Sequence, residues 1–221
     1  YSLIMALNIN GTTGISGVDG SVSAPAVTGT DSNTGITFPS ADTIKFSTGG
    51  VERMSITNSG VTGVSGGKLV NYSTVIETAV VSTSVGDGQY SGAVISISYA
   101  AASSSNKLLL IAQYNISINS SAATYGTLHI GGSPSSYRGD ASGNRLRIST
   151  SQRTGNVGGL NNHNLVTLIS SPATSSTAYD IRVSHANNIS HTVYLNRTNS
   201  DVNQTYEGRC ASSITILEFE P

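Results

Sequence analysis

The segment KLLLIAQYNISIN, from Lys107 to Asn119, decides the fold class of this 221-residue chain. Apolar side chains recur along it at every second position, and from Gln113 onward the alternate positions carry amides or hydroxyls. Because successive side chains of a strand point to opposite faces, this alternation predicts a long strand with one buried face. The residues expected on that face are Leu108, Leu110, Ala112, Tyr114, Ile116 and Ile118.

Further strand-like segments lie on both sides of it. They are rich in Val, Ile, Leu and Tyr, and turn-rich stretches such as 103–106 and 170–173 separate them. No helical period is visible, so the pattern predicts an all-β fold in which residues 68–221 form a β-sandwich or a jelly roll. The predicted strands are 69–76, 78–83, 93–99, 107–119, 124–130, 145–150, 165–169, 179–184, 190–196 and 213–219.

Residues 8–67 have a different character, because glycine recurs every few positions and leaves room only for short strands. Three are predicted, at 35–38, 43–47 and 51–57, each with two apolar side chains on one face. These side chains are too few to offset the entropy of ordering roughly sixty residues. We therefore expect identical chains to bury this face against one another around a common axis. The expected core of this shaft is Ile36, Phe38, Ile44, Phe46, Met54 and Ile56.

Composition and charge narrow the range of partners. The net charge is −1 and charged residues make up 10% of the chain, so no basic patch can neutralise a run of phosphates, and nucleic acid is not expected as a partner. The longest apolar run, Leu108 to Ala112, is far short of the ~20 residues of a membrane span, so no membrane insertion is expected. The single cysteine, Cys210, cannot form an intrachain disulfide and is expected to be a small buried hydrophobe.

No arrangement of acids or histidines predicts catalysis. Most aspartates lie in turn contexts, where they cap the backbone. Glu218 and Glu220 come nearest to the carboxylate pair of a glycosidase, but a solvated face at the chain end is the simpler explanation. The chain is therefore expected to be no enzyme and to need no metal or cofactor. The four histidines are expected at the surface or lining a pore, with the last two flanking a hairpin: His129, His163, His185 and His191.

Two parts of the sequence resemble known proteins. GTTGISGVDGSVSAPAV (11–27) and TGITFPSADTIKFSTGGVERMSITNSG (34–60) resemble a module of bacteriophage tail-fibre and other virion proteins, particularly those of cyanobacterial and marine phages. ISISYAAASSSNKLLLIAQYNIS, YLNRTNSDVNQTYEGR and SSITILEFEP resemble the head region at the ends of similar fibres. The resemblance implies a homotrimer with a jelly-roll head, similar in outline to the tumour necrosis factor and complement globular-head families, and implies no activity.

The resemblance also suggests a division of the chain. Residues 1–33 would be an N-terminal segment that attaches to other virion proteins, 34–60 a short-stranded β shaft, 61–67 a Gly/Ser linker, and 68–221 the trimerising and receptor-binding head. Residues 5–8, MALN, resemble a translation start, so residues 1–4 are expected to be non-native.

The loops of the head are rich in Tyr, Asn, Ser and Arg, which suit wet, adaptable contacts with glycans. The most varied stretch runs from Ser133 to Arg153, with 161–163 following shortly. The competing interpretation is that Arg145 and Arg147 share one strand face as trimer-interface or solvated residues. The candidate receptor-binding residues are Tyr137, Arg138, Asp140, Arg145, Arg147, Arg153, Asn161, Asn162 and His163.

Three functions are consistent with these features. The first is a virion tail-fibre adhesin that binds a glycan or lipopolysaccharide-like receptor without catalysis, with three weak sites acting through avidity. The second is a capsid decoration or head fibre built on the same trimer. The third and weakest is a short tailspike that depolymerises polysaccharide.

Overall fold

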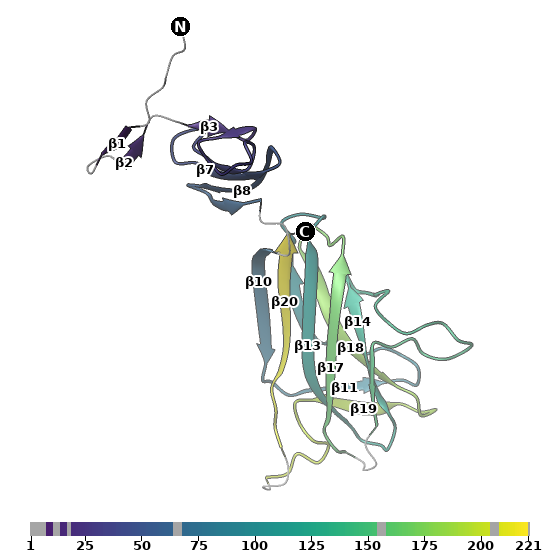
Figure 1. Cartoon of the computed structure of the whole chain (residues 1–221). Helices are drawn as coiled ribbons and strands as arrows, with labels where there is room; N and C mark the ends of the chain where they lie inside the picture. The colour runs from purple at the N-terminus through teal and green to yellow at the C-terminus, as the bar shows by residue number, and fades with distance from the viewer. Residues whose placement is uncertain are drawn as a thin grey trace. The chain divides into compact units, whose positions relative to one another are not determined.

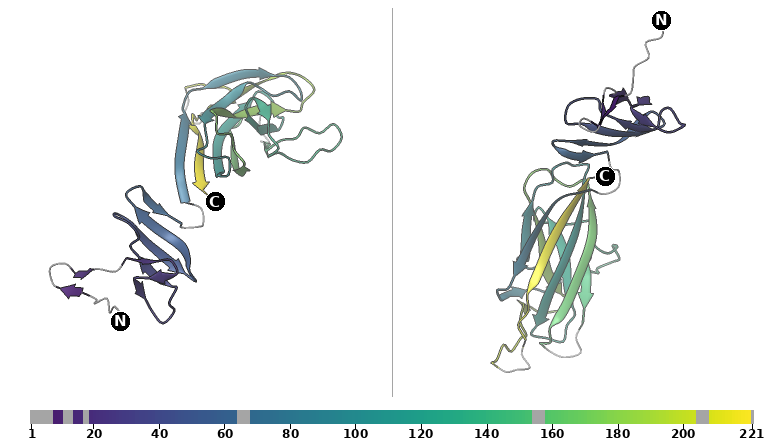
Figure 2. Two further views of the ribbon diagram at one scale, coloured as in Figure 1. Left: turned by 90° about the horizontal axis from the view of Figure 1, so that it is seen from above. Right: turned by 60° about the vertical axis from the view of Figure 1, so that its left-hand side comes forward.

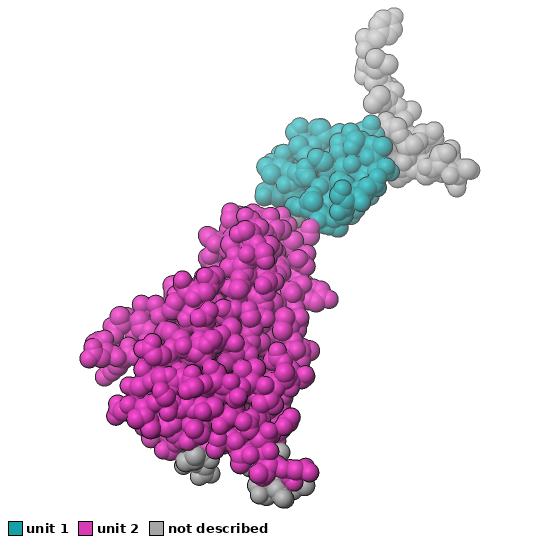
Figure 3. Space-filling model, turned by 180° about the vertical axis from the view of Figure 1, so that it is seen from behind, with its two compact units in different colours: residues 1–66 teal, residues 67–221 magenta. Residues whose placement is uncertain are grey.

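The computed structural model describes residues 8–10, 14–16, 19–63, 68–153, 158–203 and 208–220. Within these residues every regular element is a strand and none is a helix, so the predicted all-β class is confirmed. The chain divides into two compact units, residues 1–66 (unit 1) and 67–221 (unit 2), coloured separately in Figure 3. Each unit is described by itself.

Unit 1 is built from short antiparallel strands. β1 (Asn8–Asn10) pairs with β2 (Gly14–Ser16), and β3 (Gly20–Ser21) pairs with β4 (Ala24–Pro25). A five-stranded meander follows, with each strand beside the next in the chain. Its strands are β5 (Val27–Thr28), β6 (Gly35–Thr37), β7 (Ile44–Thr48), β8 (Val51–Thr57) and β9 (Gly60–Thr62).

The predicted domain boundaries do not coincide with breaks in this sheet. β5 lies before residue 33 and pairs with β6, while β9 begins at residue 60 and pairs with β8. The predicted attachment segment and shaft module therefore share one sheet.

The β7–β8 hairpin turns at Gly49 and Gly50, whose φ angles of 60° and 72° favour glycine and match the twist of a tight hairpin.

Unit 2 consists of two antiparallel sheets that enclose one core, an arrangement compatible with a β-sandwich (Figure 1). The six-stranded sheet has the order β10-β20-β13-β19-β11, and β17 also pairs with β13. Its strands are β10 (Lys68–Glu77), β11 (Val81–Val85), β13 (Lys107–Ile118), β17 (Asn161–Ser170), β19 (His191–Leu195) and β20 (Ser212–Glu220).

The five-stranded sheet has the order β12-β18-β14-β15, and β16 also pairs with β14. Its strands are β12 (Ala93–Tyr99), β14 (Thr124–Ile130), β15 (Ser133–Pro134), β16 (Thr150–Gln152) and β18 (Thr177–His185). The pairs β10·β20, β12·β18, β13·β17 and β14·β16 are nested in the sequence, the first strand of the unit pairing with the last. Residues far apart in the chain therefore meet throughout unit 2.

The core of unit 2 contains the face of β13 that the alternation predicted. The side chains of Leu108, Leu110, Tyr114 and Ile116 are fully buried, which confirms that prediction. Opposing side chains come from both sheets, among them Leu128, Ile181 and Ile216. Figure 2 shows the two sheets of unit 2 from two further directions.

Three strand predictions in unit 2 were wrong. Where a strand at 78–83 was predicted, β11 begins only at Val81 and ends at Val85. Residues 145–149 are not a strand, because the edge of β14 is already paired with β15 and with β16, which begins at Thr150. Residues 135–149 instead form a long loop, called here the lateral loop, which projects at the right of Figure 1. In addition, β17 begins at Asn161 rather than at residue 165, since its first residues continue the pairing with β13 as far as Ile116.

Gly126, in the middle of β14, allows the two sheets to approach closely. A Cβ at this position would overlap the Tyr114 hydroxyl and lie 2.6 Å from Thr150 Oγ1. We expect Gly126→Ala to lower the free energy of unfolding by about 1–3 kcal/mol, as overpacking of a filled core does. Urea denaturation measures this loss. Gly92→Ala is the matched control, because a Cβ at Gly92 would have no atom within 4 Å; equal losses in the two variants would contradict the prediction.

Candidate functional site

The six apolar side chains predicted for the shaft core lie together on one face of the unit 1 sheet, called here the shaft face. Ile36 lies directly opposite Phe46, which lies opposite Met54, and Ile44 lies opposite Ile56. Directly opposed residues of antiparallel strands share a face and are close neighbours. Part of the shaft face is open in the single chain: Phe38, Ile44 and Ile56 are 36–39% exposed, while the other three residues of the face are half-buried.

A shallow hollow lies at one end of the shaft face. Its volume is about 390 Å³, its floor includes Phe38, Ile44 and Ile56, and polar side chains such as Asp42 and Asn58 line its rim. Asn58 Nδ2 donates a hydrogen bond to Asp42 Oδ2 at 3.1 Å. The hollow therefore combines an apolar floor with an ordered polar edge.

The opposite face of the same sheet is polar and, apart from the half-buried Lys45, largely buried. Thr37, Ser47 and Ser55 are only 1–5% exposed, and the Ser55 hydroxyl bonds to Thr62 Oγ1 at 2.7 Å. A sheet in water normally covers its apolar face and solvates its polar face. In one copy of unit 1 this arrangement is reversed, so the shaft face is the part of the unit that needs a partner.

In unit 2, the lateral loop brings together most of the predicted receptor-binding residues. Asp140 and Arg145 are exposed, while Tyr137, Arg138 and Arg147 are half-buried. Arg147 Nε donates to the Gly139 carbonyl at 2.7 Å, and Asp140 Oδ1 accepts the Ala141 amide at 2.8 Å. The Arg147–Gly139 bond joins the two sides of the loop. Because residues 145–147 are not in a strand, the alternative that Arg145 and Arg147 share a strand face is wrong.

Tyr137 anchors the lateral loop to the rest of unit 2. Its ring packs against the core, and its hydroxyl accepts the Ser170 amide at 3.2 Å. The Ser149 hydroxyl donates to the Tyr137 carbonyl at 2.8 Å and accepts the Leu128 amide at 3.2 Å. Tyr137 is therefore a support for the loop more than an exposed contact.

The other four candidates lie outside the lateral loop. Arg153 is exposed after β16, and Asn162 is exposed on β17. Asn161 and His163 are only 5% and 1% exposed, so their placement on a surface loop is corrected. They point inward because alternate side chains of β17 enter the core.

His163 belongs to a buried polar cluster between the two sheets. Its Nδ1 is 3.0 Å from Thr150 Oγ1 and its Nε2 is 2.9 Å from Thr124 Oγ1, and its ring stacks on Tyr114. Asn161 Nδ2 donates to the same Thr124 hydroxyl at 3.2 Å. Both ring nitrogens of His163 have partners, so this histidine holds the two sheets together.

Burial lowers the pKa of His163 to about 4. Since the pKa in the unfolded chain is about 6.5, only the unfolded state gains this proton between pH 6.5 and pH 4. The stabilisation is therefore complete above pH 6.5 and falls by up to about 3 kcal/mol as the pH drops towards 4. Urea denaturation from pH 7 to pH 5 measures this slope, which His163→Gln should flatten.

The half-buried His191 provides the control for this pH dependence. His191→Gln should leave the slope unchanged, because His191 lies outside the buried cluster and bonds to Asn187 and Asn119 instead. Equal slopes in the wild type and in His163→Gln would contradict the prediction.

Sequence reasoning missed the burial of Glu218. This carboxylate is fully buried and accepts hydrogen bonds from Asn106 Nδ2 at 2.6 Å, Tyr99 Oη at 2.7 Å and the Ala102 amide at 2.8 Å. Burial by itself raises the pKa of Glu218, but these bonds outweigh it and hold the pKa below its ordinary value. Glu220 is exposed and lies 3.9 Å from Lys68, so the two glutamates do not form a site together.

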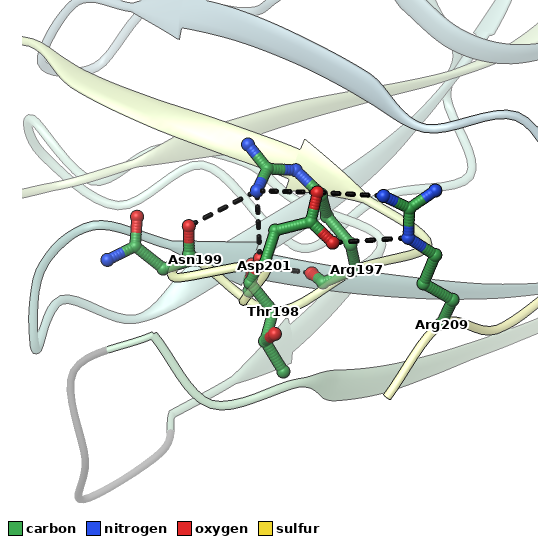
Figure 4. A network of polar contacts seen from close by, with 6 residues as sticks. Arg197, Thr198, Asn199, Asp201 and Arg209 are labelled. Atoms are coloured by element: carbon green, nitrogen blue, oxygen red, sulfur yellow. Dashed lines mark hydrogen bonds and ion pairs between the residues drawn. The ribbon is translucent and has the colours of Figure 1, made fainter. Parts of the chain in front are cut away.

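The residues after β19, 196–203, and those before β20, 208–211, are held together by charge, as Figure 4 shows. Asp201 pairs with Arg209 at 2.9 Å and with Arg197 at 3.4 Å, and the Arg197 guanidinium lies 4.0 Å above the ring of Tyr194. Cys210, next to Arg209, is exposed, so its predicted burial is wrong. Its neighbours belong to these surface residues rather than to the core.

The remaining histidines also differ from expectation. His129 and His185 are buried rather than exposed. His185 ends β18 and His191 begins β19, but these strands belong to different sheets, so the two residues flank a crossing between sheets and not a hairpin. Among the described residues, no group of three or more His, Cys, Asp or Glu side chains could hold a metal ion. The same part of the chain contains no helix with the length and apolar character needed to cross a membrane.

Comparisons with known proteins do not assign the chain to a family. No protein-family model matches its sequence, and no curated protein matches it either.

Proposed function

We propose that this chain is the homotrimeric fibre of a bacteriophage virion, with unit 1 as part of the shaft and unit 2 as the head. The observation that carries the proposal concerns the two sides of the unit 1 sheet: exposed apolar side chains lie on the shaft face, while the polar face is covered by the chain itself. Exposed apolar surface of this kind marks an interaction site. Three copies that face one axis would cover the same residues in every chain.

The outer face of the six-stranded sheet supports a second contact between copies. Val166 and Leu168 of β17 are 64% and 53% exposed, and Val166 lies opposite Ile111, which is 38% exposed. In the next strands, Leu217 lies between Leu109 and Tyr72 and extends this apolar surface. Towards Asn162 the face becomes polar, so the apolar contact would be confined to one end of the head.

The nested strand pairs of unit 2 support a jelly-roll head. A jelly roll places eight antiparallel strands in two facing sheets, and a long hairpin rolled on itself pairs the first strand with the last. β10 pairs with β20 and β13 with β17 in one sheet, while β12 pairs with β18 in the other. Together with the resemblance of both parts of the sequence to phage fibres, this order favours the fibre over other β-sandwich proteins.

We assign the head a binding role in host attachment, without catalysis. The lateral loop offers Asp140 and Arg145 to solvent. The only sequence-predicted pair of carboxylates, Glu218 and Glu220, is separated by burial of the first. Polar loops repeated three times around one axis suit weak, multivalent recognition of a cell-surface glycan.

Light scattering tests the assembly. The purified full chain should have a mass of about 68 kDa, three times the 22.7 kDa of one copy. A mass of about 23 kDa at micromolar concentration, with the shaft and head both ordered, would overturn the trimer.

Virion labelling tests the location and role. Antibodies against the head should label the tail and slow adsorption of the virus to its host, and the free trimer should compete for adsorption. Labelling of the capsid lattice would instead identify a decoration fibre. Release of oligosaccharides from host polysaccharide by the trimer would overturn the non-catalytic role.

A further inference from the structure

Four side-chain amides lie together on the outer face of the six-stranded sheet and are called here the amide array. Gln113 and Asn115 of β13 lie directly opposite Asn164 and Asn162 of β17, in that order. All four point away from the core, because the residues between them along both strands are buried. Opposed residues lie about 5 Å apart and alternate residues of a strand about 7 Å apart, so the array is comparable in size to one sugar ring.

Hydrogen bonds hold three of these amides in place. Asn164 Nδ2 donates to Asn162 Oδ1 at 2.7 Å, and Asn162 Nδ2 donates to Asn115 Oδ1 at 2.9 Å. Asn115 Nδ2 in turn donates to the Ala211 carbonyl at 2.9 Å. Binding of a ligand to these amides therefore costs little side-chain entropy, since their positions are already set.

The amide array still offers both donors and acceptors to a ligand. A side-chain amide has two N–H donors and an oxygen with two lone pairs. Each of the three asparagines uses one N–H in the bonds described above, so each keeps a second N–H and at least one oxygen lone pair. Gln113, Asn162 and Asn164 are exposed and Asn115 is half-buried, so a ligand can reach the array from solvent.

This mixture of donors and acceptors favours an uncharged ligand. An anion needs donors and a metal cation needs oxygen ligands, and charged side chains supply these best. The four amides carry no charge. A hydroxyl group both donates and accepts, as an amide does, so the hydroxyl groups of a neutral sugar match the amide array better than an ion does.

An aromatic side chain borders the array beyond Asn115. Tyr194 lies directly opposite Ser117, two residues further along β13, and the Arg197 guanidinium lies 4.0 Å above its ring. The Ser117 hydroxyl donates to the Arg197 carbonyl at 2.7 Å, and Asp201 pairs with the guanidinium at 3.4 Å (Figure 4). These contacts fix Tyr194 and Arg197 as a rigid border of the array.

The other border of the array is the apolar end of the same face. Ile111 and Val166 form the opposed pair that follows Gln113 and Asn164, and they belong to the apolar surface assigned above to contact between copies. The amide array begins where these apolar side chains end. It is therefore the part of this face that the apolar contact leaves free.

We propose that the amide array is a binding site for a neutral saccharide. Its amides donate to and accept from the sugar hydroxyls, and the Tyr194–Arg197 pair borders the bound sugar. This inference deepens the proposed function and rests on it, because it gives the head a receptor class and a site. Three copies of the site in one trimer would act through avidity.

The test is a titration of the full chain followed through the asparagine Nδ2–Hδ2 signals in NMR spectra. The neutral probes are maltotriose, cellotriose and mannotriose, and trigalacturonate is the acidic comparison. At least one neutral trisaccharide should give saturable shifts of the Asn115, Asn162 and Asn164 signals, and trigalacturonate should bind about tenfold more weakly. Equally tight binding of trigalacturonate would overturn the proposal. So would signals that no neutral trisaccharide moves, the result expected if a sister chain covers the array.

Two variants assign the binding to the amide array. Asn162→Asp keeps the shape of the side chain but cannot donate to Asn115 Oδ1, so it should weaken binding of the neutral trisaccharide by about tenfold. Asn144→Asp is the matched control, because it adds the same charge at an exposed residue of the lateral loop, and should change binding by less than about twofold. Equal effects of the two variants would contradict the assignment. If Asn162→Asp fails to fold, Asn164→Ala replaces it, with the same expected loss.

The adhesin and its proposed saccharide site can fail separately. If the trimer blocks adsorption of the virus but the neutral trisaccharides leave the asparagine signals unmoved, the site is wrong and the adhesin stands. If the signals shift and Asn162→Asp weakens binding, but the trimer does not affect adsorption, the site stands and host attachment is wrong.

Discussion

Replacing both Ile44 and Ile56 by aspartate is expected to unfold unit 1 in the assembled protein while unit 2 stays folded. These residues lie opposite each other on the shaft face. Full burial of each side chain contributes about 1.5–3 kcal/mol, so the pair contributes roughly 3–6 kcal/mol per chain when sister chains cover it. The covered side of the sheet, with Thr37, Ser47 and Ser55, has little apolar area with which to replace that contribution.

Hydrogen exchange is the appropriate measurement, because it reports each unit separately. Amides of β7 and β8 should exchange at least a hundredfold faster in the double variant, while amides of β13 keep their wild-type rates. The control is Ser32→Asp with Ser59→Asp, which adds the same charge at exposed turn residues of unit 1. Unchanged exchange in β7 and β8 of the Ile44/Ile56 variant would show that no sister chain covers the shaft face.

Local periodicity explains which parts of the fold could be predicted. β8 has the predicted bounds, and the buried face of β13 is the predicted one, because alternation over seven or more residues leaves one register that buries the apolar set. In unit 1 the sequence also identifies the apolar face. Which face of that sheet the chain itself covers depends on β3 and β4, whose two-residue strands carry no periodic signal.

Polar burial is where sequence reasoning failed. Asn161 and His163 are expected at the surface by residue type, yet Thr124 and Thr150 satisfy them in the interior. These partners lie 13 to 39 residues away in the sequence, so only the strand order reveals them. Glu218 is a similar case, since its hydrogen-bond donors come from residues 99–106, which lie 112 to 119 residues earlier in the sequence.

The failed strand at 145–150 has a related cause. Its alternation of arginine with Leu146 and Ile148 is typical of an exposed strand. A strand also needs a free edge, and β14 already has β18 on one side and β15 and β16 on the other. The same competition leaves residues 135–149 without a strand partner, and they form the lateral loop.

Glu218→Ala is expected to lower the free energy of unfolding by about 3–5 kcal/mol, the largest effect of a single substitution outside the apolar core. The change leaves two buried donors without an acceptor, on Tyr99 and Asn106, and also frees the part-buried amide of Ala102. Each stranded donor costs about 1–3 kcal/mol, partly relieved where water can enter the space left by the side chain. Glu218→Gln should cost less, because it keeps one acceptor oxygen at the same position.

Urea denaturation at pH 7 measures these losses, and Glu220→Ala is the control on the same strand. Glu220 is exposed and its contact with Lys68 is long, so its removal should cost less than about 0.5 kcal/mol. Since the pKa of Glu218 is held low, its stabilisation should be complete above the ordinary glutamate pKa near 4.5 and lost as the pH falls below it. A loss in Glu218→Ala no larger than in Glu220→Ala would mean that this carboxylate does not hold β20 to the 99–106 segment.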